Sequence, residues 1–311
     1  MATAKEVLIE RFVNLENALA SPEVLPLALT QRAHNEKARM LRNGLAIIEF
    51  NIIEDFIKRR IGEAFKYLGT CGIAFNDLPQ TIIEASLYKA LKGILQRAEN
   101  LKRTTGDHIT FIQSEAKFLA STMNSSFELS EYTLGWDKSN LSTDDLKDIF
   151  KIFKIQGGWS SVQEISSILN ITLIQPSDIF RNAAQRRHKA AHNPNSDAPI
   201  NDLTDFVLQG KIIALAFDAL ISKSLKHILD NNNDFLQGNL KTIPSQLKFR
   251  FLKNVDGKWK EYVGNSNRAY RTNTDFNILL NDSKIRAQNK NEILVIKPNE
   301  NSIKDWFITE I

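Results

Sequence analysis

Two long segments with helical periodicity constrain the fold of this chain more than any other feature. Apolar residues recur at intervals of three or four along residues 36–68 and again along residues 202–229. In both segments they cover too wide an arc of an ideal helix to be buried by one neighbour. Each helix must therefore be covered on several sides or by a second subunit. The sequence predicts a mainly α fold, built as a helical bundle.

Shorter helical patterns accompany the two long ones, and we expect helices at residues 4–20, 25–34, 79–101, 146–153 and 160–169. Ser142 and Asp145 form a capping signature ahead of the fourth of these. Residues 102–142 lack clean periodicity and predict an irregular insertion, with strand-like pieces at 109–112 and 132–136 and with His108 in a loop. A further strand-like piece covers residues 171–174.

The composition changes at the Asn- and Asp-rich segment 230–234, where we expect a domain boundary. The period of the apolar pattern then falls to two along residues 247–253 and 258–263, on either side of an Asp-Gly turn. This spacing predicts a β-hairpin, and residues 292–297 predict a further strand. We therefore expect a helical domain over residues 1–232 and a smaller β-rich domain over residues 233–311.

Basic and aromatic residues alternate in the first part of the C-terminal segment. Between Lys241 and Arg271 there are eight basic residues (241, 248, 250, 253, 258, 260, 268, 271) and two acidic ones (256, 261). The interleaved aromatic residues are Phe249, Phe251, Trp259, Tyr262 and Tyr270. Such interleaving is typical of single-stranded nucleic-acid binding, but hairpin alternation equally predicts aromatic residues on a core face and basic residues on a solvated one.

A short cationic helix is predicted between Ser177, which follows a proline and can act as an N-cap, and Asn193-Pro194, which ends it. Its basic residues are Arg181, Arg186, Arg187, His188, Lys189 and His192. Such a helix attracts anions. Arg187 and His192 are separated by roughly 140° on an ideal helix. They converge on one ligand only if the helix frays at His192 or if a second copy faces it.

The segment from Arg187 to His192 resembles the Arg-x4-6-His signature of the HEPN superfamily, whose second position is commonly Asn, Asp or His and is His188 here. As in that family, a long apolar helix follows the motif after a loop of about seven residues. The resemblance covers about residues 36–230. It implies a HEPN-like helical bundle and a metal-independent ribonuclease without a cofactor.

The resemblance also implies roles for individual residues. His192 would be the acid and base, Arg187 would hold the phosphate, and His188 would complete the catalytic group. Residues expected to contact or orient the substrate are Asn193, Arg186, Lys189 and Glu54. HEPN dimers place two motifs face to face, so a homodimer with a composite site is expected.

Among the apolar residues of segment 36–68 lie the acidic residues Glu49, Glu54 and Asp55. They can pair at one-turn spacing with Lys58, Arg59 and Arg60, which predicts that they line the solvated edge of this helix. Alternatively, Glu54 reaches the Arg187–His192 site, because the first long helix of HEPN proteins packs beside the motif helix.

Other interpretations of the motif stay open. His188 and His192 are one helical turn apart and could bind zinc, although no third ligand is evident. The segment could also be a basic helix that only caps the bundle. A third alternative is a non-catalytic module that binds nucleic acid or a partner protein. Pro194 occupies the position where some HEPN toxins carry a modified tyrosine, so that mode of control is not supported.

Composition sets the remaining expectations. The net charge of +4 permits nucleic-acid binding without requiring it, and the single Cys71 excludes an internal disulfide. No apolar run is long enough to span a membrane and the N-terminus lacks a signal peptide, so a cytoplasmic location is expected. The resemblance implies an RNA-cleaving toxin or abortive-infection effector in anti-phage defence, with a possible antitoxin or defence-system partner.

Overall fold

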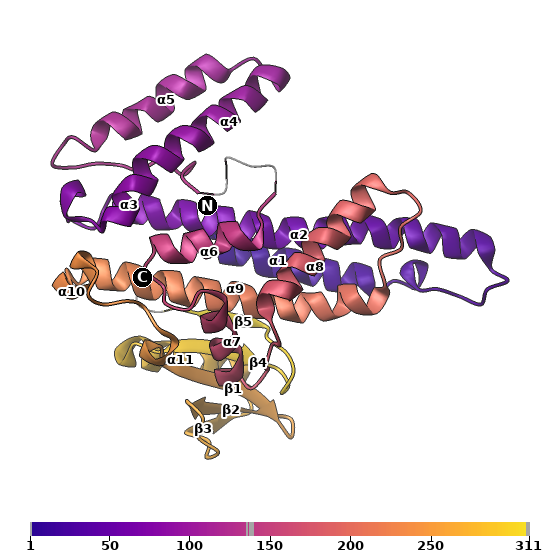
Figure 1. Ribbon diagram of the computed structural model, residues 1–311. Helices are drawn as coiled ribbons and strands as arrows, with labels where there is room; N and C mark the ends of the chain where they lie inside the picture. Colours follow the sequence, from indigo (N-terminus) through magenta and orange to yellow (C-terminus); the bar gives the residue numbers. More distant parts are fainter. Residues whose placement is uncertain (1, 135, 137–139, 309–311) are drawn as a thin grey trace. The chain divides into compact units, whose positions relative to one another are not determined.

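The computed structural model describes residues 2–134, 136 and 140–308. It confirms a mainly helical chain with a small C-terminal sheet (Figure 1). The N-terminal elements are α1 (Ala4–Leu19), η1 (Pro22–Val24), α2 (Arg32–Leu68), η2 (Phe75–Asp77), α3 (Gln80–Glu84), η3 (Ala85–Lys89), α4 (Ala90–Thr104), α5 (His108–Ser121), α6 (Thr143–Ile152) and α7 (Trp159–Ile168). The later ones are α8 (Pro176–His192), α9 (Ile200–Leu229), α10 (Asn233–Gln237), η4 (Pro244–Gln246), β1 (Phe249–Val255), β2 (Lys258–Val263), β3 (Arg271–Asn273), α11 (Phe276–Lys290), β4 (Ile293–Lys297) and β5 (Asp305–Phe307).

The chain divides into two compact units that do not follow the order of the sequence. The first contains residues 1–56, 162–216 and 249–307, and the second contains residues 57–161, 217–248 and 308–311. The first unit therefore holds the motif helix α8 together with the C-terminal strands. The domain boundary expected near residue 232 stays a prediction.

The first unit is built on tightly packed apolar helix faces. α1 begins with a capping box in which Thr3 and Glu6 exchange hydrogen bonds, and it buries Phe12 completely. Gly210 of α9 makes room for this ring, because a Cβ atom there would lie 2.9 Å from Phe12. On α8, Phe180 packs edge-on against Phe50 of α2, with ring centroids 5.3 Å apart. Both long helices, α2 and α9, are confirmed.

In the second unit, the expectation of an irregular insertion over residues 102–142 is wrong in part, because this segment contains a helix. Residues 109–112 belong to the helix α5, and His108 is its first residue rather than part of a loop. The β-branched residues that suggested a strand are overridden by pairing of α5 with α4. The described residues between 132 and 136 form no strand, and residue 135 lies outside the described part. The capping box of Ser142 and Asp145 ahead of α6 is confirmed.

Three further expectations near helix ends are wrong. Residues 25–31 form no helix, because α2 starts only at Arg32. Residues 171–174 form no strand, and the amide of Leu173 bonds to Ser166 Oγ at 2.9 Å. α8 starts at Pro176, ahead of Ser177, since proline suits the first turn of a helix and Gln175 forms the cap in the left-handed region at φ 49°.

The C-terminal strands form one mixed sheet in the order β3-β2-β1-β4-β5. β1 and β2 are the expected hairpin, in the register that pairs Phe251 with Tyr262. Asp256 and Gly257 form its turn, with φ of 55° and 73°, as a two-residue hairpin turn with two positive φ angles requires. β4 runs parallel to β1, so the chain needs a crossover between them, and α11 lies in that connection.

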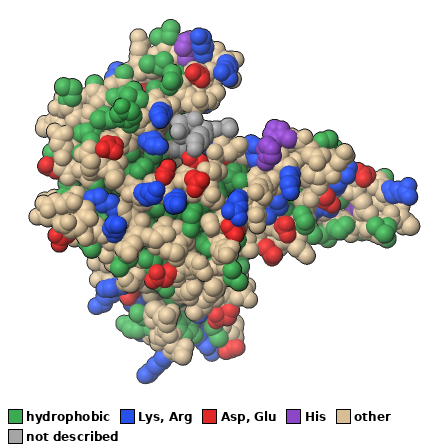
Figure 2. Space-filling model, viewed as in Figure 1, with side chains coloured by type: hydrophobic (Ala, Val, Ile, Leu, Met, Phe, Trp, Pro, Cys, Tyr) green, Lys and Arg blue, Asp and Glu red, His purple; other side chains and the backbone are tan. Residues whose placement is uncertain are grey.

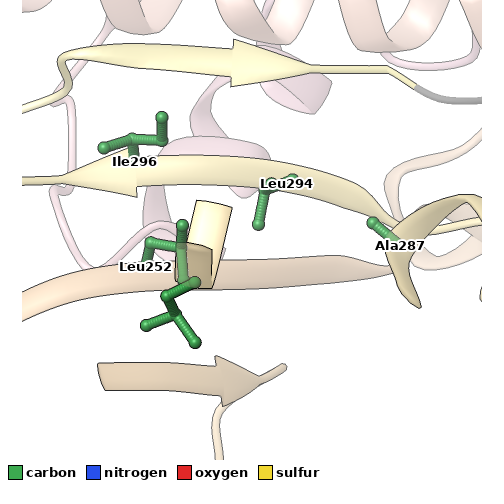
Figure 3. Packing of buried hydrophobic residues seen from close by; sticks show 5 residues of the cluster. Leu252, Ala287, Leu294 and Ile296 are labelled. Carbon is green, nitrogen blue, oxygen red and sulfur yellow. The ribbon is translucent and has the colours of Figure 1, made fainter. Parts of the chain in front are cut away.

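Helix α11 covers one face of the sheet (Figure 3). Leu252, Leu294 and Ile296 from the strands pack there against Ala287 and Leu279 of α11. This helix was not predicted from the sequence, because its asparagine-rich segment shows no clear apolar stripe. The expectation that the basic residues of the hairpin lie on a solvated face is also wrong for Arg250, which is 4% exposed.

Two lysine side chains connect the sheet to other parts of the first unit. Lys5 of α1 donates to Asp305 Oδ1 at 2.9 Å and to the carbonyl oxygen of Trp306 at 3.0 Å. Lys297 of β4 has no exposed surface, and its ammonium donates to the carbonyl oxygen of Leu169 at 2.7 Å. Burial lowers the pKa of Lys297 to about 8.

Candidate active site on the motif helix

The motif residues occupy the last turns of α8. The first half of this helix is anchored by the buried side chains of Phe180 and Ala183, whereas His188, Lys189 and His192 are exposed near its end. Figure 2 shows histidine side chains at the surface of this part of the molecule, beside lysine and arginine side chains. The sequence thus builds a helix that is apolar where it packs and cationic where it meets solvent.

The two histidines of the motif lie side by side. The ring centroids of His188 and His192 are 4.6 Å apart and the rings are tilted by 52°, as expected for side chains one helical turn apart. Two imidazoles so close together can accept and donate protons at neighbouring points of one bound substrate. The structure therefore brings together the expected acid–base residue and its expected companion.

Arg187 lies on a different side of α8. Its side chain is half-buried, and its Nε atom is buried with no hydrogen-bond partner among the described residues. An unpaired buried donor costs free energy that a bound acceptor would recover. A guanidinium in this state is suited to a phosphate group, two oxygens of which it can bind with parallel hydrogen bonds.

Arg186, the preceding residue, is held by a buried carboxylate. Its Nε and one terminal nitrogen donate to Glu49 Oε1 of α2 at 3.2 and 2.8 Å, and Glu49 has no exposed surface. Burial raises the pKa of Glu49 to about 7, even though the positive charge of Arg186 lowers it. Asp202 of α9 lies 3.9 Å from the same guanidinium. The guanidinium of Arg186 is thus occupied by contacts with α2 and α9.

The carboxylates of α2 differ from the sequence-based expectation. Glu49 and Glu54 are 0% and 6% exposed, so the prediction that they line a solvated edge is wrong for both. The wide apolar face of α2 buries positions that one-turn charge spacing alone placed in solvent. Glu49 contacts the motif helix, and sequence reasoning missed it because its partner is 137 residues away. The role expected of Glu54 at the motif stays a prediction.

The loop that follows the motif is fixed to the start of α2. Arg42, 5% exposed, donates to both carboxylate oxygens of Asp197 at 2.7 and 2.9 Å and to the carbonyl oxygen of Ala198 at 3.1 Å. Asn43 donates to the carbonyl oxygen of Ser196 at 2.7 Å. These residues were not predicted from the sequence, and only the positions of Arg42 and Glu49 on one side of α2 hint at a shared task.

Comparison with known families identifies the family of the chain. A family model described as RiboL-PSP-HEPN matches residues 16–223, about two thirds of the chain. The chain belongs to the HEPN family. Its membership indicates a ribonuclease-type or RNA-related function. No curated protein and no solved structure matches the chain.

Within this HEPN domain, the motif helix stays regular to its end. α8 continues through His192, and Asn193 follows in an extended conformation with φ −127° and ψ 102°. The side chain of Asn193 accepts a hydrogen bond from the amide of Asn195 at 2.9 Å, so its oxygen shapes the loop. Because the helix does not fray at His192, Arg187 and His192 keep the wide angular separation of an ideal helix.

The described residues of this HEPN protein contain no group of three or more histidine, cysteine, aspartate or glutamate side chains that could hold a metal ion. None of the helices in the described part of the chain has both the length and the hydropathy needed to cross a membrane.

Proposed function

We propose that this HEPN protein is a metal-independent endoribonuclease. The 2′-hydroxyl of a ribose attacks the adjacent phosphorus, the O2′–P bond forms and the bond from phosphorus to the 5′-oxygen breaks. A base takes the proton of the hydroxyl and an acid protonates the departing 5′-oxygen. The products are a 2′,3′-cyclic phosphate and a 5′-hydroxyl end, and neither a cofactor nor an oxidant is consumed.

The observation that carries this proposal is the grouping of His188, His192 and the half-buried Arg187 at one end of α8. His192 and His188 supply the proton acceptor and donor, since imidazole exchanges protons near neutral pH. Arg187 binds the phosphate and stabilises the charge that develops on it. Lys189 is exposed on the same turns and attracts the RNA backbone, and Asn193 shapes the exit of the site.

A homodimer would complete the site. Within one regular helix Arg187 and His192 lie on different sides, so a second motif facing the first would bring an arginine and a histidine to each phosphate. Exposed apolar residues on α2, the helix that carries Glu49, offer surface to a partner chain: Met40 is 70% exposed and Ile48 is 49% exposed. A partner chain covering them would remove this apolar surface from water.

The biological role that we propose is a toxin or abortive-infection effector in anti-phage defence, acting in the cytoplasm. Cleavage of cellular RNA would stop growth of an infected cell. Such an activity has to be restrained, so an antitoxin or another defence protein is the expected partner. The family match and the cationic motif helix support this role.

The proposal is tested by incubating the purified protein with labelled RNA in EDTA. Cleavage with 2′,3′-cyclic phosphate ends is expected for the wild type, and it should fall by about a hundredfold or more in Arg187→Ala and His192→Ala. Arg181→Ala is the matched control, because Arg181 lies on the same helix and pairs with Asp178 at 2.8 Å.

Two outcomes would contradict the proposal. Cleavage that persists in both motif variants would place the activity elsewhere. If the wild-type protein is a dimer and binds the RNA but leaves it intact, a non-catalytic module that binds nucleic acid is favoured instead.

A further inference from the structure

We propose that Tyr270 and Arg268, in the connection between β2 and β3, form a second RNA contact that binds one base and one phosphate of a single strand. This site lies in the C-terminal sheet, outside the matched residues 16–223. It is independent of whether the motif helix cleaves RNA.

The tyrosine ring is held rigidly although it is exposed. Tyr270 is 58% exposed, and its amide donates to the carbonyl oxygen of Glu261 at 2.7 Å. The guanidinium groups of Arg250 and Arg286 lie 5.4 and 5.9 Å from the ring centroid. A ring fixed by backbone and by two cations loses little conformational entropy when a base stacks on it.

The two arginines behind the ring are themselves fixed. Arg286 donates to both oxygens of the buried Glu261, at 3.0 and 2.6 Å, and Arg250 donates to Glu261 and to Glu292. Burial alone raises the pKa of Glu261, but these hydrogen bonds outweigh burial and lower it. Glu261 therefore stays ionised, and the two arginines neutralise its charge. It does not repel a phosphate near Tyr270.

The exposed surroundings of the ring carry positive charge. Arg268 and Arg271 are exposed on either side of Tyr270 in the sequence. The nearest acidic residues along the chain are Asp275, whose carboxylate caps α11, and the buried Glu261. The backbone of Arg268 exchanges hydrogen bonds with Ser266 Oγ, whereas its guanidinium has no hydrogen-bond or ion-pair partner among the described residues. An exposed cation beside a fixed ring is the combination that single-stranded RNA recognition uses.

The surface is hollowed at this point. A cavity of about 350 Å³ is lined by Val263, Ser266, Arg268, Ala269 and Tyr270. Its walls offer an aromatic ring and a methyl group to a base, a hydroxyl to its polar edge and a guanidinium to the phosphate. Of the interleaved aromatic residues in this segment, Phe249 and Phe251 are buried, Trp259 packs against the α11 cluster and Tyr262 is half-buried. Stacking is therefore assigned to Tyr270, which is exposed.

The test measures binding of a labelled oligoadenylate RNA of about ten nucleotides by fluorescence anisotropy, in EDTA and on a His192→Ala background that prevents cleavage. Tyr270→Ala should weaken binding about tenfold, and Tyr270→Phe should restore it, because the ring and not the hydroxyl stacks. Arg268→Ala should weaken binding and reduce the slope of log affinity against log salt by about 0.7.

The matched control is Tyr88→Ala, which removes a tyrosine that is 73% exposed on η3 in the other unit. Circular dichroism establishes that each variant is folded. Equal loss of binding in Tyr88→Ala and Tyr270→Ala, unchanged binding in folded Tyr270→Ala, or no binding of the RNA at all would overturn the proposal. Adenosine monophosphate bound as tightly as the RNA would also overturn it, since the site would then serve a free nucleotide.

Discussion

Arg186 of the motif helix donates two hydrogen bonds to a single oxygen of Glu49, and the second oxygen of this carboxylate is buried without a hydrogen-bond partner among the described residues. One of the two carboxylate oxygens therefore accepts no hydrogen bond from the described residues. Such a group is easily protonated, which agrees with the raised pKa of about 7. The motif helix is thus attached to α2 by an ion pair whose charge changes near neutral pH.

This attachment predicts a pH-dependent stability. The pKa of Glu49 is about 7 in the folded chain and near 4.5 in the unfolded chain. Between these pH values the carboxyl group keeps its proton in the folded state but has released it in the unfolded state. The free energy of unfolding should fall across that window, on the order of 3 kcal/mol from this group. Glu49→Gln cannot ionise and should lack this part of the decline. Urea unfolding of both proteins at several pH values measures it, and parallel pH profiles would contradict the prediction.

Loss of Arg42 should loosen the loop after the motif. Arg42→Ala removes the bonds to Asp197, Ala198 and Val24, and we expect a loss of about 2 kcal/mol in stability. RNA cleavage should fall in the folded variant, because His192 adjoins the released loop. Hydrogen exchange of the amides at 195–198 reports the loosening. Lys37→Ala is the control, since its pair with Glu23 is exposed, and an equal effect there would refute a specific role for Arg42.

Arg187 should not be replaceable by lysine. Arg187→Lys keeps the positive charge but lacks the planar fork that binds two phosphate oxygens, so cleavage should fall at least about tenfold. Full activity of Arg187→Lys in a labelled-RNA assay would show that charge alone suffices. His188→Asn, measured in the same assay, tells whether the second imidazole takes part in proton transfer.

Two helical glycines should respond oppositely to alanine. A Cβ atom at Gly93 would lie 2.1 Å from the carbonyl oxygen of Tyr132, a backbone atom that cannot easily move, so Gly93→Ala should cost about 1–3 kcal/mol. At Gly44 nothing lies within 4 Å, and Gly44→Ala should stabilise α2 by about 0.5–1 kcal/mol. Thermal unfolding compares the two, and equal melting temperatures would contradict both expectations.

Lys297 should make the protein more stable at alkaline pH. Its pKa is about 8 in the folded chain against 10.5 for the free group, so between these values the unfolded state holds more protons. Stability should therefore rise with pH across this window. Lys297→Met has no proton to lose and should lack the rise. Denaturant unfolding between the two pKa values measures the difference, with the exposed Lys290→Met as control.

Local signals predicted much of this fold. The apolar periodicity of α2 and α9, the capping box at Ser142 and the Asp256-Gly257 turn all depend on residues close together in the chain, and the structure contains them. The polar helix α11 was missed because it shows no clear apolar stripe and is stabilised by packing on a sheet that the periodicity of the helix itself does not reveal. α5 was missed because β-branched residues outweighed a helical pattern that needs α4 beside it.

The candidate site was predictable only in its short motif. Arg187, His188 and His192 follow from six consecutive residues, and the 4.6 Å contact of the two rings follows from helical spacing. The partner of Arg186 does not, because many carboxylates lie on helices and tertiary packing selects Glu49. The burial of Arg250 is a similar case: alternation along a strand indicates a face, but it does not show that α11 covers that face.

Arg42 and Glu49 are separated by seven residues, close to two turns of α2, so both lie on nearly the same side of the helix. One holds the loop after the motif and the other holds the motif helix itself. Insertion or deletion of a single residue between them would turn one contact away by roughly 100° while leaving the other in place. We therefore expect homologous chains to vary in residue type at exposed sites of this segment, such as Gly44. The number of residues between the two positions should stay unchanged.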